Sequence, residues 1–159
     1  MPPAPLYVDA DADRLTTILT NLIDNAIKYS PEGGAVVCEV HADGDRVYFN
    51  VTDHGLGIAR EHISRLFERF GRIVTPDNSH IAGTGLGLYL CRELARMHDG
   101  EIAVKSEIRK GSTFTLRLPL AVAVPFEESA QAEAGASKSA RTKPRISAEK
   151  GARSSAGGV

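Results

Sequence analysis

Two asparagines and a lysine share one face of a predicted helix near the start of the chain. Asn21, Asn25 and Lys28 are spaced four and three residues apart, which places their side chains on the same side of an α-helix. Asparagine is a mediocre helix former, so two of them in a helix interior need a reason. A solvated helix face is one explanation. The other is a site where an amide oxygen coordinates a hard cation such as magnesium and the lysine contacts phosphate.

A second cluster of polar and glycine residues directly follows a predicted strand. Asp53 is followed by glycines at positions 55 and 57. Glycine lets another group approach the backbone closely, and the aspartate can accept a hydrogen bond from an exocyclic amine. A dinucleotide fingerprint would need a third glycine where this chain has Arg60, and the sequence contains no G-x-x-x-x-G-K-[ST] loop. Because strand-ending turns often look similar, this pattern is weak by itself.

A third cluster opens the last predicted helix. It consists of Gly83, Thr84, Gly85, Leu86 and Gly87. A glycine-rich entry to a helix presents free backbone N–H groups and the positive end of the helix dipole to phosphate. The polar stretch 72–82 before it has the composition of a mobile lid over a nucleotide, although a plain surface loop is the better explanation of this stretch taken alone.

Two phenylalanines and an arginine precede that stretch. Phe67 and Phe70 are compatible with core positions at helical spacing, and Arg72 stands where it could reach a terminal phosphate.

Periodicity and turn residues predict the elements that must position these clusters. Asp11 can cap a helix whose apolar stripe ends at a breaker cluster, residues 30–34. The other expected elements are a strand at 6–8, hairpin strands at 35–42 and 46–52, helices at 61–70 and 86–98, and paired strands at 101–105 and 112–118. This order predicts an α/β fold, a two-layer sandwich of a mixed, mostly antiparallel sheet with about three helices on one face.

Composition excludes several classes of protein. The chain is 42% hydrophobic and 25% charged with a net charge of -1, so nothing pulls it toward nucleic acid or an anionic membrane. No signal peptide or membrane span is apparent, and we expect a soluble, cytoplasmic domain. Cys38 and Cys91 lie in apolar-patterned segments, which predicts reduced thiols in the core. Residues 1–120 are expected to form this domain, and residues 121–159, rich in Ala, Ser, Lys and Arg, to form a disordered tail.

The four clusters in this order and spacing resemble the N, G1, F and G2 boxes of the catalytic ATP-binding domain of bacterial sensor histidine kinases. The resemblance covers about Leu6 to Leu120 and implies the Bergerat ATP-binding fold, shared with gyrase, heat-shock protein 90 and mismatch-repair ATPases. The cofactors that it implies are ATP and Mg²⁺.

Carried over by position, the resemblance implies a role for each residue. Asn25 is the expected magnesium ligand, Lys28 and Tyr29 are expected beside the phosphates and ribose, and Asp53 is expected to bind the adenine amine. The other implied nucleotide contacts are Gly55, Gly57, Gly83, Thr84, Gly85, Leu86 and Gly87. The implied catalytic residues are Asn21, Lys28 and Arg72, with the arginine contacting the γ-phosphate.

Asn21 distinguishes between branches of this fold. ATPase and serine-kinase relatives typically carry a glutamate base there, and an amide cannot accept a proton. The histidine-kinase branch, in which the nucleophile comes from a separate domain, therefore fits best. None of the chain's histidines has the H-[ED]-x-[RK]-x-P context of a phosphoacceptor, and a structural or solvated role is expected for all of them: His41, His54, His62, His80 and His98.

The expected function is therefore to bind Mg-ATP and donate its γ-phosphate to a histidine on a separate domain or protein, with a response regulator receiving the phosphate afterwards. The chain is then either an excised domain or one half of a split kinase. No contact with nucleic acid or membrane is expected. The alternatives are an anti-sigma-type serine kinase and a non-catalytic ATP-dependent protein-binding module.

Overall fold

The computed structural model of the chain describes residues 5–121. The predicted disorder of the tail falls, except for Ala121, outside these residues, and the domain boundary at residue 120 stays a prediction. The elements are α1 (Ala12–Lys28), β1 (Val37–Asp43), β2 (Arg46–Asp53), η1 (Arg60–Arg65), η2 (Pro76–Asn78), α2 (Gly87–Arg96), β3 (Glu101–Glu107) and β4 (Gly111–Pro119).

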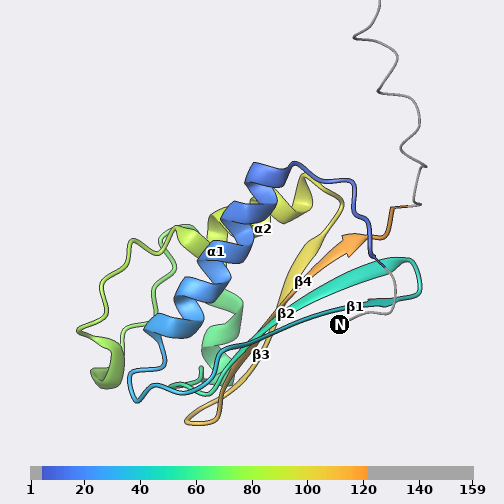
Figure 1. Cartoon of the computed structure of the whole chain (residues 1–159). Helices are drawn as coiled ribbons and strands as arrows, with labels where there is room; N and C mark the ends of the chain where they lie inside the picture. Colours follow the sequence, from blue (N-terminus) through green and yellow to red (C-terminus); the bar gives the residue numbers. More distant parts are fainter. Residues whose placement is uncertain (1–4, 122–159) are drawn as a thin grey trace, which may run out of the picture. The chain divides into compact units, whose positions relative to one another are not determined.

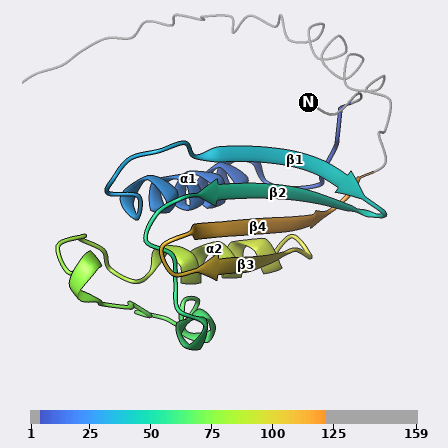
Figure 2. The ribbon, with the colours of Figure 1, turned by 90° about the horizontal axis from the view of Figure 1, so that it is seen from below.

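The four strands form one sheet in the order β1-β2-β4-β3, and every neighbouring pair is antiparallel. Both predicted hairpins are confirmed. They are joined by the pairing of β2 with β4, which places Asp53 opposite Ser112. Figure 2 shows α1 and α2 on the same face of this sheet. The two-layer α/β fold is therefore as predicted.

The expected strand at residues 6–8 is wrong. Because every strand pair is antiparallel, the sheet is also not mixed within the described residues. This segment has no strand assignment, although the Ala121 N–H donates to the Tyr7 carbonyl oxygen at 2.8 Å. One hydrogen bond without a continuing ladder does not make a strand.

The helix α1 begins and ends where its sequence dictates. The Asp11 carboxylate accepts a hydrogen bond from the Arg14 N–H at 3.0 Å, which is the predicted N-cap. Ile18, Leu22 and Ala26 form its fully buried stripe and pack on the inner face of the sheet. The polar face that carries the two asparagines therefore lies to one side of this stripe.

The end of α2 is a left-handed cap. Asp99 has a φ of 53°, and the Gly100 N–H donates back to the Ala95 carbonyl oxygen at 3.0 Å. This six-to-one bond satisfies a carbonyl that the end of a helix leaves free. The predicted stop at these two residues is confirmed, with the aspartate rather than the glycine in the left-handed conformation.

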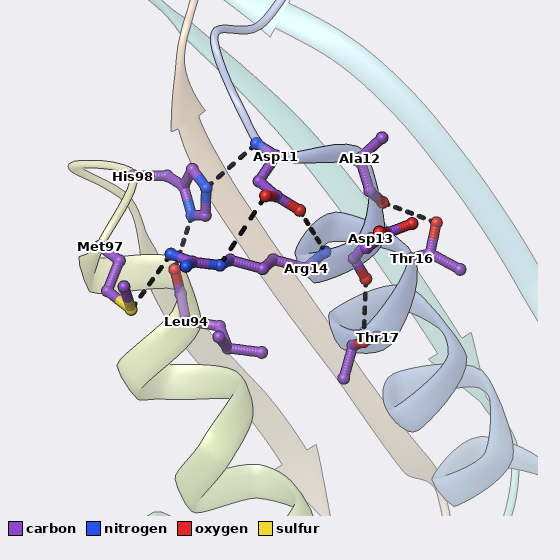
Figure 3. A network of polar contacts seen from close by, with 9 residues as sticks. All are labelled: Asp11, Ala12, Asp13, Arg14, Thr16, Thr17, Leu94, Met97 and His98. Carbon is purple, nitrogen blue, oxygen red and sulfur yellow. Dashed lines mark hydrogen bonds and ion pairs between the residues drawn. The ribbon is translucent and has the colours of Figure 1, made fainter. Parts of the chain in front are cut away.

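His98 joins the end of α2 to the start of α1 (Figure 3). Its Nδ1 lies 2.8 Å from the Leu94 carbonyl oxygen, and its Nε2 accepts the Asp11 N–H at 3.1 Å. A carbonyl only accepts, so Nδ1 carries the proton and the imidazole is neutral when both bonds form. The expectation of a structural role for this histidine is consistent with these contacts.

Two further expectations fail. The helix expected at 61–70 is a 3-10 helix, Arg60–Arg65, followed by turns, and Phe70 has a φ of 63°. Cys38 is exposed, because β1 is an edge strand that α1 does not cover. Cys91 is buried between the helices as expected, and burial raises the pKa of its thiol to about 11.

Candidate functional site

A cavity of about 480 Å³ lies between α1, the loop after β2 and the segment that leads into α2. Figure 1 shows these segments together at one end of the helix pair. The cavity is lined by most of the residues predicted from the sequence: Asn21, Asn25, Lys28, Tyr29, Asp53, Gly57, Arg72, Gly83, Thr84, Gly85 and Gly87. Gly55 and Leu86 do not line it. Four segments far apart in the sequence thus meet around one cavity.

The α1 side of the cavity presents two amides in different situations. Asn21 is held by its own helix, because its Nδ2 donates to the Thr17 carbonyl oxygen at 3.0 Å. The side chain of Asn25 makes no hydrogen bond with any residue of the described range 5–121, and it faces the cavity one turn further along. Its amide oxygen is therefore available to an occupant.

Asp53 lies at the buried end of the cavity and is only 4% exposed. Its Oδ1 accepts two backbone N–H groups, from Gly55 at 2.9 Å and from Ser112 at 3.2 Å. Burial raises the pKa of this carboxyl above its usual value, and the two N–H donors oppose the rise. The two bonds fix the carboxyl group and leave Oδ2 for a donor in the cavity.

The loop after Asp53 needs its glycines for packing. A Cβ on Gly55 would lie 2.0 Å from the Tyr29 carbonyl oxygen, which also accepts the Leu56 N–H. Gly57 has a φ of 66°, and its Cβ would lie 1.9 Å from the Glu107 carbonyl oxygen. Gly55 therefore shapes the site by letting the loop lie against the end of α1, and this explains why it does not line the cavity.

The segment before α2 is fastened by its own side chains. Asn78 Oδ1 accepts the Thr75 N–H at 2.8 Å and its Nδ2 donates to the Ile73 carbonyl oxygen at 3.0 Å. Arg72 Nη2 donates to the carbonyl oxygen of Ile81, a residue whose side chain is buried. The guanidinium that was predicted to contact a phosphate thus lines the cavity while it holds this loop.

The sequence did not single out the other residues that line the cavity, although positions 73–82 belong to the stretch with the composition of a lid. They are Leu56, Ile58, Ala59, His62, Leu66, Gly71, Ile73, Thr75, Asp77, Asn78, Ala82, Leu88, Ile108, Ser112 and Phe114. Ser112 and Phe114 are two residues apart in β4 and lie on the face that carries the core. The alternation of side chains along a strand could have predicted this shared face from the sequence. The residues before α2 carry no periodic signal.

The described part of the chain contains neither a cluster of metal-ligating side chains nor a membrane-spanning helix. Among residues 5–121, no group of three or more His, Cys, Asp or Glu side chains could hold a metal ion. None of the helices there is long and apolar enough to cross a membrane.

The sequence of the chain matches a known protein family. Residues 10–122 match the family model described as histidine kinase-, DNA gyrase B-, and HSP90-like ATPase. The chain belongs to this family. Similar proteins include sensor histidine kinases: the chain is 40% identical over 121 residues to WalK of Bacillus subtilis and 42% identical over 119 residues to RcsC of Escherichia coli.

The alignments cover 75% of this chain but only 20% of WalK and 12% of RcsC. The chain therefore corresponds to the ATP-binding part of much longer relatives.

Solved histidine kinases share the fold of this family member. Full-length ShkA in complex with AMPPNP superposes with a TM-score of 0.64 at 35% identity, over 75% of this chain and 24% of ShkA. The mycobacterial sensor histidine kinase MprB gives a TM-score of 0.63 at 30% identity, over 73% of this chain and 76% of the MprB chain. These comparisons confirm the resemblance to histidine-kinase catalytic domains and the predicted fold.

Proposed function

We propose that this domain binds Mg-ATP in the 480 Å³ cavity and donates the γ-phosphate to a histidine on a separate partner domain or protein of a two-component system. The observation that carries the proposal is the meeting of Asn25, Asp53 and the 83–87 loop around one cavity. An amide oxygen, a fixed acceptor for an amine and a glycine-rich helix entry match the three chemical parts of a metal nucleotide. The AMPPNP complex of the similar ShkA supports this occupant.

The residues present suit Mg²⁺ with ATP. Magnesium commonly uses one or two protein oxygens plus substrate phosphates and waters, so a free amide on Asn25 meets the need without an acidic cluster. The ion would neutralise charge on the phosphates. Lys28 and Arg72 would hold the phosphate end, and Tyr29 would lie near the ribose.

The chain's own contribution to transfer is positioning. Asn21 offers no base, since its amide nitrogen is committed to the Thr17 carbonyl oxygen and an amide oxygen does not take up a proton at neutral pH. Water in the cavity would therefore not be activated by this residue. The domain would keep ATP for an imidazole that enters from outside, aligned in line with the γ-phosphate. Because ATP is supplied in the cytoplasm, the proposal places the domain there.

Labelled ATP tests the proposal directly. The chain is incubated with Mg²⁺, [γ-³²P]ATP and a helical-hairpin protein from the same genome that carries an H-[ED]-x-[RK]-x-P sequence. We expect label on the hairpin that is lost in acid and kept in alkali, and no label when the hairpin histidine is replaced by alanine. The label should then pass to a response-regulator aspartate.

Two outcomes would overturn this function. Acid-stable label on a partner would indicate the serine-kinase alternative. Tight ATP binding without transfer to any acceptor histidine of the genome would indicate the non-catalytic binding module.

A further inference from the structure

Ser106 forms a hydrogen-bonded junction between three segments at the buried end of the cavity. It lies on β3, opposite Ser112 of β4 in the strand register. Its Oγ accepts the Ile58 N–H at 2.8 Å and lies 2.9 Å from both the Gly111 carbonyl oxygen and the Ser112 Oγ. The loop after Asp53 is thereby tied to the β3–β4 hairpin through one hydroxyl group.

Counting donors determines where the protons of this junction lie. The hydroxyl of Ser106 has one proton and two acceptor positions. The Gly111 carbonyl can only accept and the Ile58 N–H can only donate, so all three contacts form only if Ser106 donates to Gly111 and accepts from Ser112. The proton of Ser112 then points toward Ser106, away from the cavity.

Ser112 consequently presents an acceptor to the cavity that it lines. It is 6% exposed, and its own N–H donates to Asp53 Oδ1 at 3.2 Å. Two acceptors, the Asp53 carboxylate and the Ser112 hydroxyl oxygen, therefore lie side by side at the buried end. A buried acceptor that faces a donor of the ligand forms a hydrogen bond. A buried acceptor that faces another acceptor stays unsatisfied, which costs binding free energy.

We infer that Ser106 is a positioning residue for base selectivity: it takes the Ser112 proton and so makes this end of the cavity accept the amine of adenine and reject the carbonyl of guanine. The inference rests on the proposed function, because it requires that the cavity holds a purine nucleotide. Without the Ser106 hydroxyl, Ser112 is free to turn its proton into the cavity and donate to a carbonyl. Selectivity would then fall although Ser106 itself does not line the cavity.

The test compares the affinities of the full chain for Mg-ATP and Mg-GTP by calorimetry. We expect Ser106→Ala to lower the ratio of ATP to GTP affinity by about tenfold, the size expected for one misdirected hydrogen bond. Ser106→Thr keeps the hydroxyl and should keep the ratio. Thr115→Val is the matched control, since it deletes a sheet hydroxyl whose partner is Asn50, neither residue being at the cavity; its ratio should equal that of the wild type.

A double-mutant cycle separates positioning from a general loss of structure. If Ser106 acts through the Ser112 proton, Ser106→Ala should change the ratio in the wild type and add nothing in a Ser112→Ala background. Should Ser106→Ala fail to fold, Ser112→Ala alone must lower the ratio while Ser106→Thr preserves it.

A folded Ser106→Ala variant with the wild-type ratio overturns the inference and leaves the proposed function standing. A wild-type chain that binds neither nucleotide overturns both. If Ser106→Ala changes the ratio of ATP to GTP affinity as expected but the wild-type chain transfers no phosphate to an acceptor, only the kinase function is overturned.

Discussion

Asn21 of α1 lies directly against Gly87 of α2: a Cβ on the glycine would be 2.6 Å from the amide Oδ1. The close approach exists because the first residue of α2 has no side chain. Both residues line the cavity. The spacing of the two helices at this point is therefore set by the contact of the Asn21 amide with the Gly87 backbone.

Gly87→Ala should separate stability from binding. Alanine is favoured over glycine by about 1 kcal/mol in a helix interior, which is the upper bound for Gly87 as the first residue of α2. The added methyl group must push the Asn21 amide aside and break its bond to Thr17, a loss of about the same size. We therefore expect a free energy of unfolding within about 1 kcal/mol of the wild type, measured in urea.

Affinity for ATP in the same variant should fall by at least about tenfold, because the methyl group also enters the cavity. Gly83→Ala controls for the stability measurement, since a Cβ at that position would meet no atom within 4 Å. Unchanged ATP affinity in a folded Gly87→Ala variant would show that the occupant does not reach the start of α2.

Asn25→Ala should remove most of the magnesium-dependent part of nucleotide binding. The amide oxygen of Asn25 accepts no hydrogen bond from residues 5–121 and faces the cavity, so we expect a loss of about a hundredfold in affinity for Mg-ATP. In EDTA the variant and the wild type should bind ATP with the same affinity, because Asn25 contributes to binding through Mg²⁺ and EDTA removes this ion. Asn50→Ala on the sheet is the matched control. A loss of only a few fold in the presence of Mg²⁺ would contradict the site assignment.

Asp53→Asn should weaken ATP binding while it removes a pH-dependent cost of folding. Burial raises the pKa of this carboxyl in the folded state. As the pH rises above 3.8, the folded chain therefore keeps the Asp53 proton to a higher pH than the unfolded chain does. Stability from this group therefore falls as pH rises from 3.8 through the raised pKa. An asparagine Oδ1 can still accept from Gly55 and Ser112, so the variant should keep the fold without this loss.

Urea unfolding at a series of pH values from about 4 to 7 measures the effect of Asp53→Asn. The stability of the variant relative to the wild type should grow as pH rises, and a difference that shrinks would mean that the carboxylate is stabilising.

His98→Ala should loosen the helix pair without affecting the cavity. The substitution removes the hydrogen bonds to Asp11 and Leu94 and should cost about 1 to 2 kcal/mol of unfolding free energy. ATP affinity should stay within about twofold, because the contact lies at the other end of α1. His80→Ala, at an exposed position before α2, should leave stability unchanged. A large loss of ATP affinity would show that the contact also sets the geometry of the site.

Local signals explain what the sequence allowed us to predict. The Asp11 cap, the turn at Asp43-Gly44-Asp45 and the stop at Asp99-Gly100 all act over a few residues, and the structure contains each of them. The glycine clusters were recognisable because backbone packing excludes other residues at positions such as Gly57. Most of the candidate site was therefore predictable as a set of pieces.

The rest depends on contacts distant in sequence. The segment at 61–70 has helical spacing, but a turn with Phe70 in the left-handed region replaces the last part of a helix there, and the backbone of this residue packs where a Cβ on Gly85 would lie. Exposure of Cys38 follows from β1 lying at the edge of the sheet, and strand order is not a local property. Ser112 reaches the cavity only because β4 pairs with β2.

Two of the contacts that join the helices are Asp11 with His98 and Asn21 with Gly87, where Asp11 is the N-cap of α1 and His98 lies two residues past the end of α2. At 1.5 Å per residue, these points are about 15 Å apart along α1 and about 16.5 Å apart along α2 and the turn that follows it. The two lengths agree to within about one residue, so an inserted or deleted residue in either helix would leave one of the two contacts unmade. Length variation in this protein should therefore be confined to its loops, with the number of residues between each pair of contact points held constant.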